Sequence, residues 1–243
     1  LANSGARLAL SDIDLRAVTE TAQLLRAGTT SAAYHLDVTS LEAVHAHADD
    51  VVRDFGHVDL LFNNAGSAML GTFEHQTLEE MEWLIDLDLW SVVYCTKAFL
   101  PLMLARREGW IVNISSIAGL IGFPALSTYS IAKFAVRGMT ESLWSELEGT
   151  GVKAVCVHPG GIKTNIERAS RRCSNAGAVE ARADKLNKHT LRTPPERCAA
   201  DILDGIRRGR RRVVTGYRSR TVDWLARLIP NAYPALFGKI FAG

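Results

Sequence analysis

Three side chains, Ser116, Tyr129 and Lys133, have the types and the spacing for acid–base chemistry. Tyr129 and Lys133 are four residues apart, so on a helix they lie on one face, one turn apart. Ser116 follows an apolar run, 111–114, that is typical of a buried strand, and it can face the pair across a loop. A hydroxyl, a phenol and an ammonium that meet there form an acid–base device, because a nearby positive charge lowers the pKa of the phenol. A Tyr/Lys pair alone also occurs on solvated helix faces, where it contributes little.

The elements that must position these side chains alternate between apolar runs and amphipathic stretches. The apolar runs predict strands at 7–12, 32–38, 58–62, 111–114 and 152–157. The periodic stretches predict helices at 15–27, 41–55, 78–106 and 128–148, the third either continuous or broken near 86–90. This alternation predicts βαβ units and a Rossmann-type doubly wound parallel sheet. Because the 243 residues contain no repeat or linker, we expect residues 1–243 to form a single α/β domain.

The composition argues against several classes of function. The chain is 47% hydrophobic and 22% charged with a net charge of +2, so nucleic acid is not an expected partner. The arginine run at 207–212 is interpreted as a solvated element end. The four cysteines are widely spaced and the seven histidines show no ligand pattern, so we expect reduced thiols, a cytoplasmic location and no metal site. Without an apolar run of about 18 residues or a signal-peptide pattern, no spanning helix is expected.

Four predicted strand ends carry residues suited to a ligand, since ligands of open α/β sheets bind beyond the carboxyl ends of the strands. Asp12 ends the first strand, where its carboxylate can accept both ribose hydroxyls of an adenosine; the alternative is an N-cap of the next helix. Asp37 and Val38 end the second, where turn chemistry is the alternative. The third and fourth ends read Asn63-Asn64-Ala65-Gly66 and His158-Pro159-Gly160-Gly161-Ile162-Lys163-Thr164.

Together these motifs resemble the short-chain dehydrogenase/reductase family. The resemblance rests on Ser116 thirteen residues before Tyr129, the Tyr-x-x-x-Lys pair, Asn-Asn-Ala-Gly after a buried strand, and a Pro-Gly-x-Ile-x-Thr-like segment. It covers about residues 1–164, and extends more loosely to 216. It implies a nicotinamide cofactor and an alcohol or ketone as substrate. Tyr129 would transfer the hydroxyl proton, Ser116 would hydrogen-bond the substrate oxygen, and Lys133 would bind the nicotinamide ribose and lower the pKa of Tyr129.

The resemblance also implies the contacts of the cofactor. Asp12, followed by Ile13 rather than Arg, favours NAD over NADP, although the family's Gly-rich turn often carries the basic residue that NADP needs. The remaining cofactor contacts would be Asp37 and Val38 at the adenine, then Asn64, Ala65 and Gly66, and then Pro159, Gly160, Ile162 and Thr164 near the nicotinamide.

Two features depart from the family pattern. The Gly-rich turn Thr-Gly-x-x-x-Gly-x-Gly and the first strand are missing before Leu1, and we expect the real protein to contain them, in roughly 30 or more preceding residues. Asp88 stands where family members carry an Asn that helps to link the Lys to solvent. An ionised Asp cannot donate the hydrogen bond of an amide, and it brings a negative charge close to Lys133. We therefore count Asp88 among the catalytic candidates and expect Asp88→Asn to keep or raise activity.

Substrate choice is expected to reside in two segments: 165–190, a helical lid, and 217–243, a C-terminal extension. The extension is expected to pack on this or a neighbouring subunit rather than on a membrane surface. The cleft rim is predicted to be apolar, which suggests a hydrophobic, lipid- or steroid-like alcohol or ketone; its residues are Ile117, Ala118, Leu120, Phe123 and Leu126.

Two other functions compete with an alcohol dehydrogenase or ketone reductase. One is a non-catalytic nicotinamide-nucleotide-binding regulatory protein, which Asp88 alone favours. The other is an extended epimerase or dehydratase, which also uses Tyr and Lys but normally has a longer chain. The resemblance further implies a homodimer or homotetramer formed through the helices at 78–106 and 128–148.

Overall fold

Parallel strands form the centre of the structure, a computed structural model that describes residues 1–166 and 170–235. β1 (Leu8–Asp12) pairs with β2 (Ser31–His35). A four-stranded sheet follows, in the order β3 (Leu60–Asn63), β5 (Gly109–Ile114), β6 (Val152–Gly160) and β8 (Arg212–Gly216). β4 (Met69–Leu70) and β7 (Arg171–Arg172) make a short third pair. All strand pairs are parallel, so the predicted α/β architecture is confirmed.

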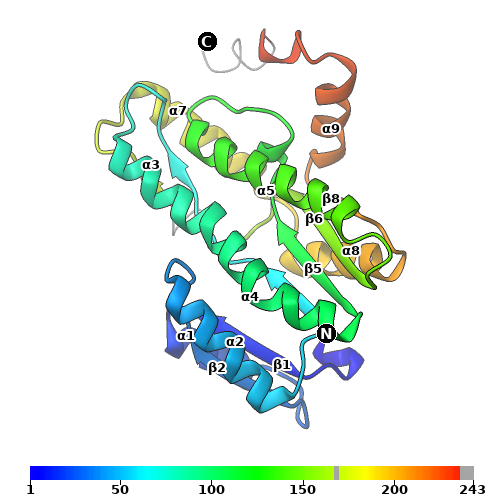
Figure 1. The fold of residues 1–243 in the computed structure, drawn as a ribbon. Helices are drawn as coiled ribbons and strands as arrows, with labels where there is room; N and C mark the ends of the chain where they lie inside the picture. Colours follow the sequence, from blue (N-terminus) through cyan, green and yellow to red (C-terminus); the bar gives the residue numbers. More distant parts are fainter. Residues whose placement is uncertain (167–169, 236–243) are drawn as a thin grey trace.

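Helices cover both faces of the four-stranded sheet (Figure 1). α4 (Ser91–Arg106) and α5 (Ser127–Glu146) pack on one face, where Met103 and Leu143 meet Ile111 and Ala154. α8 (Pro195–Arg207) packs on the other face, where Ile206 meets the buried strand side chains Val112, Val155 and Val157. Because successive strand residues point to opposite faces, Ile111 and Val112 belong to different cores. These two cores hold the carboxyl ends of β5 and β6 in place.

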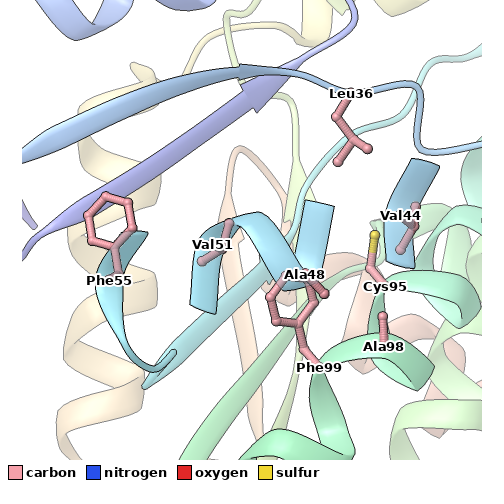
Figure 2. Close-up of a cluster of buried hydrophobic side chains, with 8 residues drawn as sticks. All are labelled: Leu36, Val44, Ala48, Val51, Phe55, Cys95, Ala98 and Phe99. Atoms are coloured by element: carbon pink, nitrogen blue, oxygen red, sulfur yellow. The ribbon is translucent and has the colours of Figure 1, made fainter. Parts of the chain in front are cut away.

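The β1–β2 pair is joined to the larger sheet through helices rather than through strand hydrogen bonds. α2 (Leu41–Phe55) packs against α4, and Figure 2 shows the cluster that results. Its buried members are Leu36, Val44, Ala48, Val51 and Phe55 with Cys95, Ala98 and Phe99. Among the described residues no strand pairs with both β1 and β3, so the β1–β2 pair is separate from the four-stranded sheet. The preceding strand and Gly-rich turn stay a prediction.

Three helices, α1, α2 and α3, begin with side-chain caps that can be read in the sequence. Ser40 caps α2 by accepting from the Ala43 N–H, as predicted. Asp14 rather than Asp12 caps α1 (Leu15–Gln23), because its side chain accepts from the Arg16 and Ala17 N–H groups. α3 (Leu78–Ile85) begins with a capping box formed by Thr77 and Glu80.

The long helix predicted at 78–106 is continuous but not uniform. A π-helical turn, η2 (Asp86–Trp90), joins α3 to α4 at the position where a break was one of the two predicted outcomes. Such wide turns are rare and are frequently found at functional sites. The stretch Leu78–Arg106 also has the length and mean hydropathy (1.3) of a membrane span, which the sequence reading did not expect. Its packing on α2, β3 and β5 is that of a core helix.

Several boundaries differ from the predicted ones. β6 continues to Gly160 rather than 157, because its pairing with β8 runs from Cys156 to Gly160. The predicted lid contains β7 and α7 (Ala178–Thr190), and residues 167–169 of it lie outside the described part. The C-terminal extension contains α9 (Ser219–Leu228), and its residues 236–243 are likewise outside that part. Two short 3₁₀ turns, η1 (Ala2–Ser4) and η3 (Ile117–Gly119), precede β1 and follow β5, respectively.

Candidate functional site

Ser116, Tyr129 and Lys133 meet at the carboxyl end of β5, as predicted from their spacing. Ser116 follows β5 in an extended conformation (φ −164°), and its Oγ accepts the Ala118 N–H at 3.1 Å, which starts η3. Tyr129 and Lys133 lie on the first turns of α5, with Lys133 Nζ 5.6 Å from the centroid of the Tyr129 ring. The Ser116 hydroxyl lies close enough to Tyr129 to lower the pKa of its phenol. The hydroxyl, the phenol and the ammonium therefore form one cluster.

Asp88 is the fourth member of this cluster. It lies on the π-helical turn η2 and is fully buried. Its Oδ2 lies 2.9 Å from Lys133 Nζ, and its Oδ1 accepts the Ser67 N–H at 2.7 Å. Gly66 packs directly against this pair, since a Cβ there would lie 2.9 Å from Asp88 Oδ1 and 3.5 Å from Lys133 Nζ. The wide turn thus brings a carboxylate to the ammonium, and Gly66 leaves room for it.

The charges in the cluster do not produce the expected change in Tyr129. Burial raises the pKa of Tyr129, and the negative charge of Asp88 raises it further. Lys133 and the Ser116 hydroxyl lower that pKa, but the net direction is upward. Burial also lowers the pKa of Lys133, but Asp88 and Tyr129 outweigh this, so its ammonium is stabilised. The predicted influence of Lys133 on the phenol is present, yet it does not dominate.

Backbone contacts hold the cluster in place. Ser115 Oγ donates to the Lys133 carbonyl at 2.8 Å, and Lys133 Nζ donates to the Ile114 carbonyl at 3.3 Å. The fully buried His158 donates from Nδ1 to the Ser116 carbonyl at 3.0 Å. Burial lowers the pKa of His158 to about 4, so this imidazole is neutral at physiological pH. The sequence alone gives His158 no role, because only the folded strand places it behind Ser116.

The adenosine-side candidates lie at the ends of β1 and β2. Asp12 is exposed, and its Oδ1 accepts the Asp14 N–H at 2.9 Å. Because Asp14 caps α1, the alternative role of Asp12 as an N-cap is wrong. Asp37 Oδ1 accepts from both the N–H and the Oγ1 of Thr39, which lowers the pKa of Asp37, so its turn role is present. Val38 beside it is half-buried.

The Asn-Asn-Ala-Gly segment divides into a structural and an exposed part. Asn63 is buried and donates to Thr96 Oγ1 at 3.1 Å and to Asn113 Oδ1 at 2.8 Å, while Asn113 donates to Thr140 Oγ1 at 2.9 Å. This buried network joins β3, β5, α4 and α5. Asn64, Ala65 and Gly66 are exposed and available to a ligand. The sequence did not distinguish the two asparagines, because only the sheet decides which one points into the core.

The last set of candidates follows the carboxyl end of β6. Gly160 is tightly packed, since a Cβ there would lie 2.9 Å from Ile117 Cγ2. Ile162 forms an isolated bridge with Thr193, and the exposed Thr164 accepts the Ile166 N–H at 3.4 Å. With Pro159 they lie at the same edge of the sheet as Ser116, because all the strands are parallel.

A second buried carboxylate, which the sequence reading missed, joins the predicted lid to the body. Glu180 on α7 is 1% exposed. It accepts from the Thr72 N–H, the His75 Nδ1 and the Gly177 N–H, each at 2.9 Å. Burial raises the pKa of Glu180, but these hydrogen bonds outweigh it and hold the pKa well below the usual range. We refer to Glu180, His75, Thr72 and Gly177 as the lid clasp.

The predicted apolar rim is only partly correct. Ala118 and Leu120 are buried, and Leu120 packs with Ile121 and Val222 of α9, so these two side chains belong to the core. Leu126 packs against Leu70 and Ala183, in contact with β4 and α7. Ile117 and Phe123 are partly buried. The rim is therefore narrower than predicted, because the C-terminal extension covers one side of it.

Two further observations concern metal binding and the opposite end of the strands. Among residues 1–166 and 170–235, no group of three His, Cys, Asp or Glu side chains could bind a metal ion. A hollow of about 300 Å³ lined by Trp110, Trp144 and Lys153 lies at the amino ends of β5 and β6, away from Ser116.

Comparison with known proteins agrees with this geometry. The family model described as short chain dehydrogenase matches residues 1–175. A Mycobacterium tuberculosis protein named as the oxidoreductase SadH is 42% identical over 239 residues, which cover 97% of this chain and 86% of the relative. A 3-alpha-(or 20-beta)-hydroxysteroid dehydrogenase of Mycobacterium bovis is 41% identical over 130 residues, which cover 54% of this chain and 50% of the relative.

Solved structures show the same similarity. A short-chain dehydrogenase from Streptomyces avermitilis matches 98% of this chain and 89% of its own, with a TM-score of 0.86 and 27% identity. A short-chain dehydrogenase/reductase from Burkholderia phymatum in complex with NAD matches 97% and 88%, with a TM-score of 0.84 and 26% identity. ElxO with NADP bound matches 69% and 68%, with a TM-score of 0.64 and 29% identity.

Proposed function

Because the chain belongs to the short-chain dehydrogenase/reductase family, we propose that it transfers a hydride between a nicotinamide cofactor and a secondary alcohol or the corresponding ketone. The observation that carries this proposal is the contact among Ser116, Tyr129 and Lys133 at the carboxyl end of β5. Tyr129 holds the proton that is exchanged with the substrate oxygen. Ser116 donates a hydrogen bond that stabilises the charge developing on that oxygen, and Lys133 orients the reacting partners.

The residues at the carboxyl edge of the sheet fit a nicotinamide dinucleotide. Asp12 and Asp37 would hold its adenosine end, and the exposed backbone of 64–66 permits close approach. Gly160 leaves no space for a side chain beside Ile117, which keeps the backbone after β6 close to the site. When bound, the cofactor supplies or accepts the hydride.

NAD is the cofactor we propose, because Asp12 is exposed at the end of β1 and its charge would repel a 2′-phosphate. The test compares kcat/KM for NAD and NADP in the wild type and in Asp12→Ala. We expect the wild type to favour NAD and the variant to lose most of that preference. Equal or better use of NADP by the wild type would refute the assignment.

A hydrophobic substrate is proposed from the apolar side chains that flank the clasp. Phe73 (68% exposed) and Val179 (44% exposed) lie on two segments that the hydrogen bonds of Glu180 hold together. The β-bridge between Gly71 and Leu126 places the segment that carries Phe73 next to the 123–126 loop. The similarity to a hydroxysteroid dehydrogenase over half of the chain supports this class. Competition between steroid and short-chain alcohols for turnover tests it, and a higher kcat/KM for the short alcohols would contradict it.

A homodimer or homotetramer is proposed through α4 and α5, whose outer faces expose large apolar side chains. These are Leu102 (38%) on α4 and Ile131 (46%) and Phe134 (40%) on α5, with Trp90 (45%) on the preceding turn η2. Light scattering of the wild type and of Ile131→Asp should show a smaller particle for the variant. A monomeric wild type at micromolar concentration would contradict the proposal.

A non-catalytic nucleotide-binding protein is the second candidate, since Asp88 neutralises the ammonium on which the chemistry depends. Binding of NAD without turnover of any alcohol or ketone in a broad panel would favour it.

A further inference from the structure

The ion pair between Asp88 and Lys133 is the feature of the site that the proposed reaction does not explain. Asp88 is fully buried, and the Lys133 side chain is only 6% exposed. Both carboxylate oxygens face donors, because Oδ1 accepts the Ser67 N–H and Oδ2 lies 2.9 Å from the ammonium.

A paired ammonium acts differently on the neighbouring phenol from an isolated one. The ammonium alone would stabilise the Tyr129 phenolate. A carboxylate 2.9 Å from the ammonium places a negative charge beside the positive one, so the two electrostatic effects on the phenolate largely cancel. The other groups that face the pair do not restore the positive charge. Ser116 is an uncharged hydroxyl, the Cys156 thiol on β6 has its pKa raised to about 12 by burial, and His158 is neutral.

We propose that Asp88 keeps Tyr129 in its phenol form through neutral pH by neutralising Lys133, so that the proton donor for ketone reduction is present up to a higher pH than an unpaired Lys133 would allow. Asp88 is a positioning residue, since it acts on the reaction through Lys133. The inference rests on the proposed function. The upward direction of the Tyr129 pKa, with Asp88 among its causes, agrees with it.

The proton balance of the reaction shows which form of Tyr129, phenol or phenolate, each direction needs. In reduction, a bound reduced nicotinamide would supply a hydride to the carbonyl carbon, the C=O π bond would break, and the oxygen would take the proton of Tyr129 Oη. The resulting phenolate regains a proton from solvent. Reduction therefore needs the phenol and declines above its pKa, whereas alcohol oxidation needs the phenolate and increases towards that pKa. A raised pKa of Tyr129 therefore moves both the decline of reduction and the increase of oxidation to higher pH.

The first test measures the ionisation of Tyr129 without any substrate. The near-ultraviolet absorbance of phenolate is titrated in the full chain, and the same titration of Tyr129→Phe is subtracted. Asp88→Asn should lower the pKa of Tyr129 by about one unit or more. Asp86→Asn is the matched control, because Asp86 is exposed on the same π-helical turn, and it should leave the pKa unchanged. Asp88→Ser, which still offers an acceptor to the Ser67 N–H, replaces Asp88→Asn if that variant does not fold.

The second test measures kcat/KM against pH in both directions, with cyclohexanol and cyclohexanone as probes. In Asp88→Asn both profiles should move to lower pH by the shift found in the titration. Unchanged titration and unchanged profiles would overturn the inference. A shifted titration in a protein that binds NAD but has no turnover would contradict the proposed reaction, while the control of Tyr129 by Asp88 would stand.

Discussion

The acid–base cluster and the lid clasp each contain one buried carboxylate, but the two carboxylates have different partners. Asp88 faces an ammonium and one backbone N–H, whereas Glu180 accepts two backbone N–H groups and the His75 ring. Asp88 therefore changes the charge beside Tyr129, and Glu180 fixes the position of two chain segments. A buried carboxylate can thus tune a reaction or join segments, and its donors decide which.

Removal of the phenol should have the largest effect and should leave the clasp intact. Tyr129→Phe should lower kcat by roughly 10²–10⁴-fold, because general acid–base catalysis contributes about that much. Steady-state kinetics measures the loss, and the binding of NAD, measured calorimetrically, should change little. A variant that retains most of its turnover would mean that Tyr129 is not the proton donor.

Neutralising Glu180 should lower the stability of the protein and weaken substrate binding more than it lowers kcat. Glu180→Gln turns one accepting oxygen into a donor and leaves at least one buried N–H without a good acceptor, so we expect a loss of about 1–3 kcal/mol in unfolding free energy. KM should rise more than kcat falls, since the lid segment loses its fixed position. The exposed Glu74 on the same loop is the control, and Glu74→Gln should change neither quantity. A fall in kcat with unchanged KM would argue that Glu180 acts on the chemistry.

The contribution of Glu180 should also depend on pH. The folded-state pKa of Glu180 lies below its unfolded value near ~4.3, so its stabilisation is fully present above that value and is lost as pH falls further. Thermal unfolding should therefore show a difference between wild type and Glu180→Gln that is constant near neutral pH and shrinks below about pH 4. A difference that grows as the pH falls would contradict the assignment.

Gly66 beside Asp88 and Gly177 beside Glu180 allow the packing around the two buried carboxylates to be compared with matched Gly→Ala substitutions. An Ala Cβ at Gly66 would lie 2.9 Å from Asp88 Oδ1, whereas one at Gly177 would lie 3.7 Å from Glu180 Oε2, an ordinary contact. Gly66→Ala should displace Asp88 and change kcat/KM by roughly tenfold, which corresponds to about 1.4 kcal/mol. Gly177→Ala should be close to neutral in both activity and Tm. Equal effects of the two substitutions would indicate that the packing around Asp88 is not tighter than that around Glu180.

The local pattern of the sequence was sufficient for the elements and for three members of the acid–base cluster. Alternation of apolar runs with amphipathic stretches predicts the parallel α/β fold, because each element carries its own periodicity and caps, as Ser40 does for α2. Tyr129 and Lys133 could be paired because helix geometry fixes residues four apart. Asp88 was recognised only by alignment with the family motif, and the sign of its effect on Tyr129 was not predictable.

Tertiary structure decided what depends on contacts between distant segments. Asn63 rather than Asn64 enters the core, because β3 turns that side chain toward Asn113 on β5. Glu180 meets His75 across 105 residues, and no spacing rule links them. The charge of Lys133 is neutralised because the π-helical turn carries Asp88 under the start of α5. Periodicity specifies what one element does, but the pKa of a buried group depends on every charge and dipole that the fold brings around it.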